Sequence, residues 1–294
     1  MVEEGGTGGY ESTGHGDEAS HAERLRRYYE DTWFEYRLLW LDRRTRALHF
    51  GYEQPGTHRH GASLLALNHV MAEHAGLKAG ERVLDAGCGV GGTSMWLAEV
   101  YGAEVVGVNL VADHVERARR YVRERRLFDR VRFEVADYTR TGMQGGTFDV
   151  VWAQESACHA PDKAAFTAES HRLLRPGGRV VLAEYLAAPG PHGGDLRAWE
   201  DAWEMTLCSA AQWTEALTGT GFVDIRTDDV TDHMRRSLRR LRRLCLVLGP
   251  IAGALHAVKV RTETQQRNIA GSLAMWRALQ SREWSYGIVT ATRP

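Results

Sequence analysis

An acidic residue and several closely spaced glycines stand together in the first third of the chain. The segment 82–93 reads RVLDAGCGVGGT, with Asp85 just before Gly87 and Gly89. Glycines allow a tight turn and let the backbone approach a ligand closely. The next residues, 93–98, predict the start of a helix, whose free N–H groups and dipole favour an anion. An acid followed by N–H donors therefore suits a ligand that carries both an ammonium and a carboxylate group.

Two further polar clusters follow hydrophobic segments that we predict to be strands. Asn109 and Leu110 stand at the end of one of them, where dinucleotide enzymes hold the ribose hydroxyls with an acid. An amide can also bond to a hydroxyl, although it departs from that pattern. After the next strand, Asp137 can accept a hydrogen bond from an adenine amino group, and Tyr138 can lie against the ring. These residues indicate a nucleoside beside the glycine turn.

A carboxylate and an imidazole lie four residues apart after another predicted strand. The segment 152–163 reads WAQESACHAPDK and contains Gln154, Glu155 and His159. Glu155 and His159 can each take up a proton, and Glu155 can also stabilise a neighbouring cation. Because parallel sheets bind ligands at the carboxyl ends of their strands, we expect these side chains beside the glycine turn.

The two segments together resemble a known family. The segment 82–93 resembles the cofactor motif of class I S-adenosylmethionine-dependent methyltransferases, and the segment 152–163 resembles the corresponding part of sterol side-chain and terpenoid C-methyltransferases. The resemblance covers about residues 25–190 and implies S-adenosyl-L-methionine as the cofactor. The related enzymes also place an N-terminal tyrosine near the cofactor. The cofactor-binding residues predicted in this way are Tyr28, Asp85, Gly87, Gly89, Asn109, Leu110, Asp137, Tyr138 and Gln154.

The resemblance implies transfer of a methyl group to an alkene carbon of an isoprenoid, such as a terpenoid, a prenyl compound or a sterol-like molecule. An alkene that attacks the methyl group becomes a carbocation, which aromatic faces and anions stabilise and a base then deprotonates. We predict Glu155 and His159 as the catalytic residues. The alternative keeps the cofactor and methylates an oxygen or nitrogen of a small secondary metabolite, with His159 or Glu155 as the general base.

Two other classes of protein share parts of this pattern. The glycine spacing G-x-G-x-x-G also fits a nicotinamide dehydrogenase, but Asp85, the pair Asp137 and Tyr138, and the lack of an acid at position 109 argue against it. A protein that only senses the cofactor would not explain Glu155. We predict no metal ligands, because His58 and His60 lack partners at a recognised spacing.

Regular alternation of strands and helices must position these residues. It predicts an α/β fold with a doubly wound, mostly parallel seven-stranded sheet, the Rossmann-like methyltransferase fold. The predicted strands are 82–85, 104–109, 131–135, 148–153, 179–184, 222–227 and 284–291. The predicted units are a disordered tail (1–21), a helical cap (22–76), the cofactor-binding core (77–230), a helical lid (231–280) and the last strand (281–294).

Composition limits the classes of molecule that we expect this protein to bind. The net charge of -1 argues against nucleic acid, and four cysteines without paired spacing, together with an N-terminus lacking an apolar run, predict a cytoplasmic protein. The apolar stretch 244–258 is too short to span a bilayer, so we expect no integral membrane association. We expect a hydrophobic small-molecule acceptor that can carry an anionic group, and the sequence is compatible with a homo-oligomer.

Six arginines within positions 235–243 stand out in the predicted lid. Three interpretations remain open for them: a solvated helix face, a clamp for an anionic group on the acceptor, or, together with the apolar stretch 244–258, attachment to a membrane surface.

Overall fold

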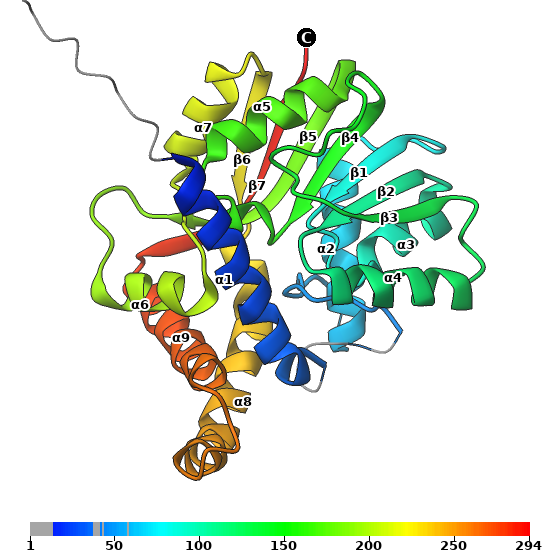
Figure 1. Cartoon of the computed structure of the whole chain (residues 1–294). Helices are drawn as coiled ribbons and strands as arrows, with labels where there is room; N and C mark the ends of the chain where they lie inside the picture. The colour runs from blue at the N-terminus through cyan, green and yellow to red at the C-terminus, as the bar shows by residue number, and fades with distance from the viewer. Residues whose placement is uncertain (1–13, 38–41, 43, 58) are drawn as a thin grey trace, which may run out of the picture.

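The computed structural model describes residues 14–37, 42, 44–57 and 59–294. A seven-stranded sheet in the order β3-β2-β1-β4-β5-β7-β6 forms its centre (Figure 1). β7 is antiparallel to both of its neighbours, and the other described pairs are parallel. The strands are β1 (Arg82–Ala86), β2 (Glu104–Asn109), β3 (Val131–Val135), β4 (Phe148–Gln154), β5 (Leu174–Ala187), β6 (Val223–Asp229) and β7 (Trp284–Thr292). The predicted fold class is confirmed.

Helices cover both faces of this sheet, because the strands are apolar on both sides. Successive residues point to opposite faces, so Val83 packs on the side of α2, α3 and α4 and Leu84 on the side of α5 and α7. The helices are α1 (Gly14–Glu35), α2 (His60–His74), α3 (Gly92–Tyr101), α4 (Ala112–Glu124), α5 (Lys163–Leu173), α6 (Gly194–Trp203), α7 (Ala210–Gly219), α8 (Thr231–Ala257) and α9 (Glu263–Gln280), with a short 3-10 helix, η2 (Ala157–His159).

A second helical layer lies beside one end of the sheet and consists of α1, α6, α8 and α9 (Figure 1). α9 packs against α1 and α6 as well as against α8, so the N-terminal helix and the segment predicted as a lid touch each other. Most of the predicted tail, residues 1–13, lies outside the described residues, and α1 begins at Gly14.

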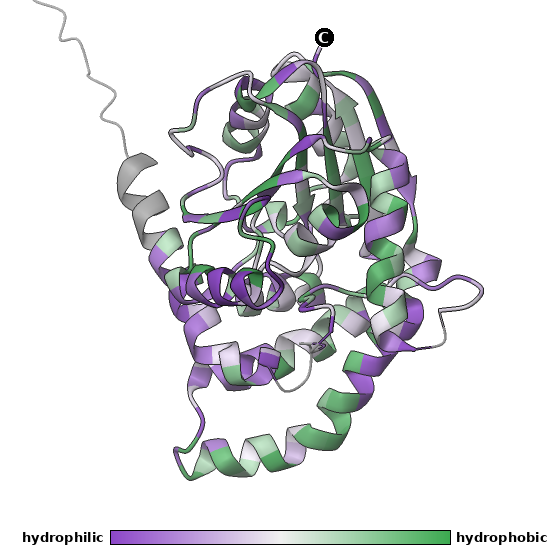
Figure 2. Cartoon of the chain, turned by 90° about the vertical axis from the view of Figure 1, so that its right-hand side faces the viewer, coloured by the Kyte–Doolittle hydropathy of each residue, from purple (hydrophilic) through white to green (hydrophobic). Residues whose placement is uncertain are grey.

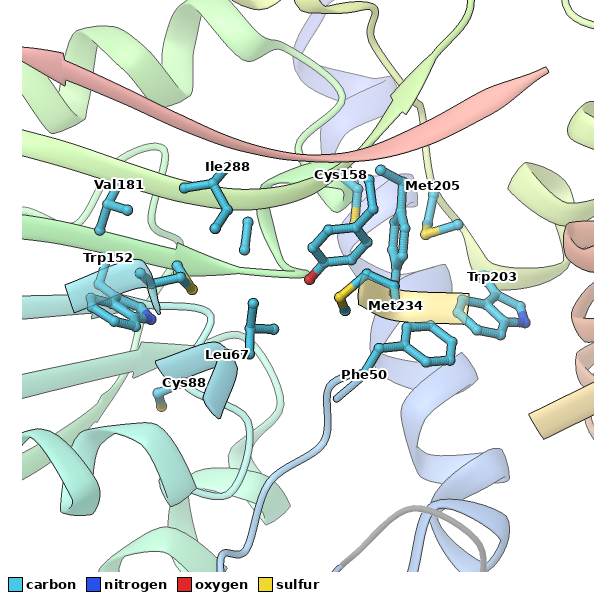
Figure 3. Close-up of a cluster of buried hydrophobic side chains, with 14 of the residues drawn as sticks. Phe50, Leu67, Cys88, Trp152, Cys158, Val181, Trp203, Met205, Met234 and Ile288 are labelled. Atoms are coloured by element: carbon cyan, nitrogen blue, oxygen red, sulfur yellow. The ribbon is translucent and has the colours of Figure 1, made fainter. Parts of the chain in front are cut away.

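The helical layer and the sheet share one hydrophobic cluster. Val181 and Ile288 belong to strands at one end of this cluster, and Trp203 and Met234 belong to α6 and α8 at the other (Figure 3). Because the cluster is continuous, the helical layer is held against the sheet by the same burial of apolar surface that stabilises the core.

α8 includes Gly249 and Pro250, two residue types that disfavour the interior of a helix. The helix continues through Pro250 to Ala257. Proline inside a helix removes one backbone hydrogen bond, but packing of the inner face, including Cys245 and Ala252, against the rest of the fold maintains the helix. Among the described residues, no helix combines the length and the apolar character needed to cross a bilayer.

Candidate active site

A cavity opens at the carboxyl ends of β1, β2 and β4 and holds about 1020 Å³ of space between atoms, its mouth included. The segment 46–49 and α1 cover it, and residues that follow α6 close its far side. Its lining includes the predicted residues Asp85, Gly87, Gly89, Asn109, Leu110, Tyr138, Gln154, Glu155 and His159. The topology thus brings together side chains that are far apart in the sequence, at the edge expected for a parallel sheet.

The glycine turn forms the floor of this cavity. Gly87 has a φ of +84°, and a Cβ there would lie 2.4 Å from Cβ of Ser156, so a side chain is excluded. Gly91 precedes α3 and provides no side-chain cap, so the first N–H groups of that helix are available to a ligand anion.

Asp85 is a buried acid beside this turn and accepts a hydrogen bond from Ser94 Oγ at 2.5 Å. Burial raises the pKa of Asp85 to about 6, and its bonds to Ser94 oppose that shift. A ligand cation at this point would restore the carboxylate. The turn therefore supplies both halves of a site for an ammonium and a carboxylate group, and its residues fit the amino-acid end of S-adenosylmethionine.

The segment 46–49, which we call the cavity roof, lies directly on the glycine turn. A Cβ at Gly92 would lie 2.4 Å from the backbone oxygen of Arg46, and a Cβ at Gly89 would lie 3.3 Å from Cδ1 of Leu48. Such close approach leaves no room for a larger residue at position 92. A ligand on the turn is therefore enclosed between the turn and the roof.

The nucleoside side of the cavity contains the residues predicted at the ends of β2 and β3. Asn109 Oδ1 accepts a hydrogen bond from the N–H of Val111, which leaves its amide N–H groups for a ligand. Tyr138 lines the cavity, and its hydroxyl donates to the Ser156 carbonyl. Asp137 lies outside the main lining, in a small adjoining pocket that shares Leu110, Tyr138 and His159 with it.

Gln154 lies on the other side of the turn and is held by three side chains. Its Oε1 accepts from Thr93 Oγ1 at 2.9 Å and from Trp152 Nε1 at 3.3 Å, and its Nε2 donates to Asn68. This network fixes β4 against the start of α3, and hence the position of the next residue, Glu155.

Glu155 lies at the junction of the cavity and the aromatic core. Its Oε1 accepts from the N–H of Phe50 at 2.8 Å and from the Tyr286 hydroxyl at 2.7 Å, and its Oε2 accepts from the Tyr185 hydroxyl at 2.5 Å. Burial raises the pKa of Glu155 to about 7, although the three donors favour the carboxylate. Its backbone is in the left-handed region, with φ of +52°. Strained backbone of this kind is concentrated at functional sites.

Two buried charged residues hold the turn that carries Glu155. Glu184 Oε1 accepts from the N–H groups of Ser156 and Ala157, at 3.1 and 2.7 Å. Lys163 Nζ donates to three carbonyl oxygens of the same turn, including that of Cys158 at 3.1 Å. The backbone after β4 is therefore bonded on both sides, which explains how Glu155 keeps its conformation.

His159 forms a pair with Tyr29 of α1. The Glu204 carbonyl lies 2.9 Å from His159 Nδ1 and only accepts, so Nδ1 carries the proton and Nε2 accepts from the Tyr29 hydroxyl at 2.9 Å. Burial lowers the pKa of His159 to about 4, so the ring is neutral. The neighbouring Tyr28 lies elsewhere: its hydroxyl is bonded to Tyr36 and Asn268, and it is not part of the cavity lining. The tyrosine of α1 that faces the cavity is therefore Tyr29, not the predicted Tyr28.

Sequence reasoning missed two histidines that line the cavity, His49 and His114. Both are buried, and the Nε2 atom of each has no protein partner. The Nδ1 atom of His49 donates to the Phe50 carbonyl at 2.8 Å, so Nε2 of His49 is an acceptor that a ligand could use. Burial lowers the pKa of both rings to about 4. No sequence signal marks them, because neither belongs to a spaced motif.

The arginine run does not line the cavity. Arg236, Arg239, Arg240 and Arg243 border a different groove, between α8 and the segment that leads to α2. Arg46, in the roof, is the one arginine or lysine among the described cavity-lining residues.

Within the described part of the chain no three His, Cys, Asp or Glu side chains form a metal-binding group, and His58 lies outside that part.

Comparison with known proteins identifies the family of this chain. The family described as "Methyltransferase domain" matches residues 84–182. A phosphoethanolamine N-methyltransferase of Triticum aestivum is 34% identical over 164 residues, which are 56% of this chain and 32% of that enzyme. The chain thus spans about a third of the length of that relative.

Two other proteins match over most of their length. The 27-O-demethylrifamycin SV methyltransferase of Amycolatopsis mediterranei is 36% identical over 195 residues, 65% of this chain and 71% of that enzyme. The solved structure of geranyl diphosphate C-methyltransferase from Streptomyces coelicolor A3(2), with Mg2+, geranyl diphosphate and S-adenosyl-L-homocysteine, superposes with a TM-score of 0.73 at 20% identity. The superposed region covers 93% of this chain and 98% of the geranyl diphosphate C-methyltransferase chain. The chain therefore belongs to the S-adenosylmethionine-dependent methyltransferases and is an enzyme of that family.

Proposed function

We propose that this enzyme transfers a methyl group to an alkene carbon of a hydrophobic isoprenoid. One observation carries the proposal: the cavity contains a carboxylate, Glu155, held by two tyrosine hydroxyls and a backbone N–H and surrounded by aromatic rings. An anion and electron-rich faces are what a carbocation next to the transferred methyl requires.

The side of the cavity formed by the strand ends would hold the cofactor. Asp85 would bind its ammonium group, the N–H groups that begin α3 would bind its carboxylate, and Asn109 would bind its ribose. Asp137 and Tyr138 border the adenine ring. When bound, S-adenosylmethionine supplies an electrophilic methyl group on a positively charged sulfur.

The residues on the opposite side act on the acceptor. Tyr185 and Trp203, which both line the cavity, present their rings to the developing cation. Glu155 lies against Tyr185 and stabilises the positive charge through space. Its pKa of about 7 also suits it to take the proton that restores a double bond, because a base is most effective when its pKa is near the working pH.

The class of acceptor follows from the lining. Among the described residues, the cavity lining contains one arginine and several aromatic and apolar side chains, which suits a neutral or weakly polar chain of carbon atoms. Geranyl diphosphate and tocopherol, named for enzymes with this fold or sequence, both contain isoprenoid units. We expect prenylated aromatics or sterol-like alkenes to bind better than free prenyl diphosphates.

The test is incubation of the full chain with cofactor labelled in the methyl group and a panel of prenyl diphosphates, prenylated aromatics and sterols. Mass spectrometry and NMR of the product then locate the label. Label on an sp3 carbon next to a shifted double bond supports the proposal. Label found only on oxygen or nitrogen, over the whole panel, would overturn it.

A second candidate, methylation of an acceptor oxygen or nitrogen, is favoured by the pair Tyr29 and His159. The 2.9 Å bond allows the acceptor proton to pass to the Tyr29 oxygen as the Tyr29 proton moves to His159 Nε2. The low pKa of His159 makes it a weaker base than Glu155, which is why we place this candidate second. Under it, Tyr29→Phe and His159→Asn would both abolish turnover, whereas Glu155→Gln would retain most of it.

A further inference from the structure

The outer face of α8 carries a row of exposed apolar side chains in its second half. Val247, Ile251 and Val258 are 71%, 61% and 68% exposed. Val247 and Ile251 are four residues apart and lie on one side of the helix, and Val258 is the residue directly after its end. The inner face of α8 is buried, through residues that include Met234 and Leu241. Figure 2 shows the apolar half of α8 at the edge of the molecule, away from the sheet. Within the described part of the chain, most of the surface of these side chains is therefore not packed against other residues.

The first half of the same outer face is cationic. Arg236, Arg240 and Arg243 precede Val247 by eleven, seven and four residues, so they continue the apolar row along the helix. Arg239 borders the same groove. Positions 233–262 contain eight arginines and lysines and no aspartate or glutamate. Three of these arginines are paired with acids. Glu53, before α2, pairs with Arg236, and Glu35 of α1 pairs with Arg261. Asp232, in the first turn of α8 itself, pairs with Arg235.

We propose that this outer face of α8 docks on the surface of an anionic lipid bilayer. A helix that lies in the plane of a membrane needs apolar side chains that enter the acyl boundary and basic side chains that meet the headgroups. Val247, Ile251 and Val258 meet the first need, and Arg239 and Arg243 meet the second. The inference concerns attachment to the surface and is independent of which atom the enzyme methylates.

A second copy of the chain fits this face less well. Two parallel copies of α8 would bring the arginines of each half together, and two antiparallel copies would bury arginines against the apolar row. The one acid on α8, Asp232, is already paired with Arg235 at the start of the helix and cannot compensate either arrangement, and buried charges without partners are costly. A negatively charged lipid surface supplies both the apolar layer and the compensating charge.

Attachment through α8 would bring the cavity close to the membrane, because the first turns of α8 contact the segment that follows the cavity roof. The N–H of Gly51 donates to Ser237 Oγ of α8 at 3.0 Å, and the N–H of Glu53 donates to the His233 carbonyl at 2.8 Å. Tyr52 stacks on His233, with ring centroids 4.3 Å apart. The residues that connect the roof to α2 are thus bonded to the first turns of α8. A hydrophobic acceptor dissolved in the bilayer would meet the enzyme at the edge of its cavity.

Co-sedimentation of the full chain with vesicles tests the proposal. Vesicles of phosphatidylcholine alone are compared with vesicles that also contain phosphatidylglycerol, at low and at high salt. We expect binding to the anionic vesicles, weakened by salt because headgroup attraction is screened. Arg239→Gln with Arg243→Gln should weaken partitioning by roughly 30-fold. Val247→Glu with Ile251→Glu should abolish it.

Matched variants elsewhere separate docking from general charge or hydrophobicity. Arg120→Gln with Arg123→Gln removes two exposed charges from α4, and Phe128→Glu removes an exposed apolar side chain that is 61% accessible. Both should bind vesicles like the unaltered chain, and thermal melting checks that every variant is folded. Equal binding by the α8 variants, or no binding to anionic vesicles at low salt, would overturn the proposal. So would a dimer in light scattering that Val247→Glu with Ile251→Glu dissociates, since a second copy would then cover the face.

Discussion

Replacement of Glu155 by glutamine removes a negative charge and almost nothing else. The glutamine oxygen can still accept from the Phe50 N–H and the Tyr286 hydroxyl, which are 2.8 and 2.7 Å from Oε1 of the glutamate. The Tyr185 hydroxyl can rotate and accept from the new amide, because a hydroxyl both donates and accepts. The variant therefore keeps the shape of the site and tests the charge alone.

The structure predicts opposite effects on stability and on activity. Burial raises the pKa of Glu155 from its ordinary 4.5 to about 7, so the folded protein holds this proton more tightly than the unfolded chain. This rise in pKa corresponds to at most about 3 kcal/mol, and to less here because the side chain is partly exposed to the cavity. That stability is present below pH 4.5 and is lost as the pH rises through 7. At pH 8 the neutral glutamine should therefore raise the free energy of unfolding.

The effect on turnover should be a large loss. In the proposed reaction the carboxylate meets a positive charge that forms only as the methyl is transferred, so its removal lowers kcat more than it changes cofactor affinity. We expect a decrease in kcat of about 10²-fold or more. For the unaltered enzyme, kcat/KM should fall about tenfold per pH unit below pH 7. The decrease in kcat should begin at a lower pH than the decrease in kcat/KM, because the positively charged sulfonium of the bound cofactor favours the carboxylate form of Glu155.

Three measurements test these predictions. Urea unfolding at pH 5 and 8 gives the stability, and calorimetry gives the cofactor affinity. Rates measured over a range of pH, with the acceptor found by the panel, give kcat and kcat/KM. His159→Asn is measured in parallel, because it removes the other candidate base. A Glu155→Gln enzyme with near-normal kcat and an unchanged pH profile, alongside an inactive His159→Asn enzyme, would refute this reasoning and favour transfer to oxygen or nitrogen.

Three further predictions concern the cofactor site and the helical layer. Asp85→Ala should weaken cofactor binding by about 1–3 kcal/mol through loss of a charged hydrogen bond, and unchanged affinity in calorimetry would contradict its assignment. Gly92→Ala should weaken binding at least about tenfold by displacing the cavity roof, whereas Gly194→Ala, with nothing within 4 Å of the added Cβ, should bind normally. Asn268→Leu leaves the buried Glu35 without one of its donors, so the free energy of unfolding in urea should fall by about 1–3 kcal/mol; a smaller change would show that the bond is dispensable.

The sheet could be predicted from the sequence because its strands are short apolar runs with clear ends. β2 and β3 have the predicted bounds, Glu104–Asn109 and Val131–Val135, and residues at strand ends must meet at one edge whatever the details of packing. Glu155 and His159 could be found for the same reason. Their hydrogen-bond partners could not, since Tyr286 and Glu204 come from segments whose approach to β4 depends on the whole fold.

The tyrosine of α1 shows where sequence reasoning ends. Tyr28 and Tyr29 are about 100° apart around the helix, and local pattern does not determine which of them faces the cavity. The rotation of α1 is set by long-range contacts: the Tyr28 hydroxyl donates to Asn268 of α9, and Gln265 of α9 donates to the Asp31 carbonyl. Such polar contacts between elements more than 200 residues apart leave no periodic trace in the sequence.

One short segment connects the cavity with the surface of α8. The N–H of Phe50 donates to Glu155, and the N–H of the next residue, Gly51, donates to Ser237 of α8. Displacement of this segment would remove one of the three donors that favour the carboxylate and admit water to the cavity. In the proposed reaction, exclusion of water would keep the carbocation from being quenched. A bilayer docked on α8, as proposed, would contact the helix that holds this segment, so the charge at Glu155 and the entry of the acceptor would both depend on one stretch of backbone.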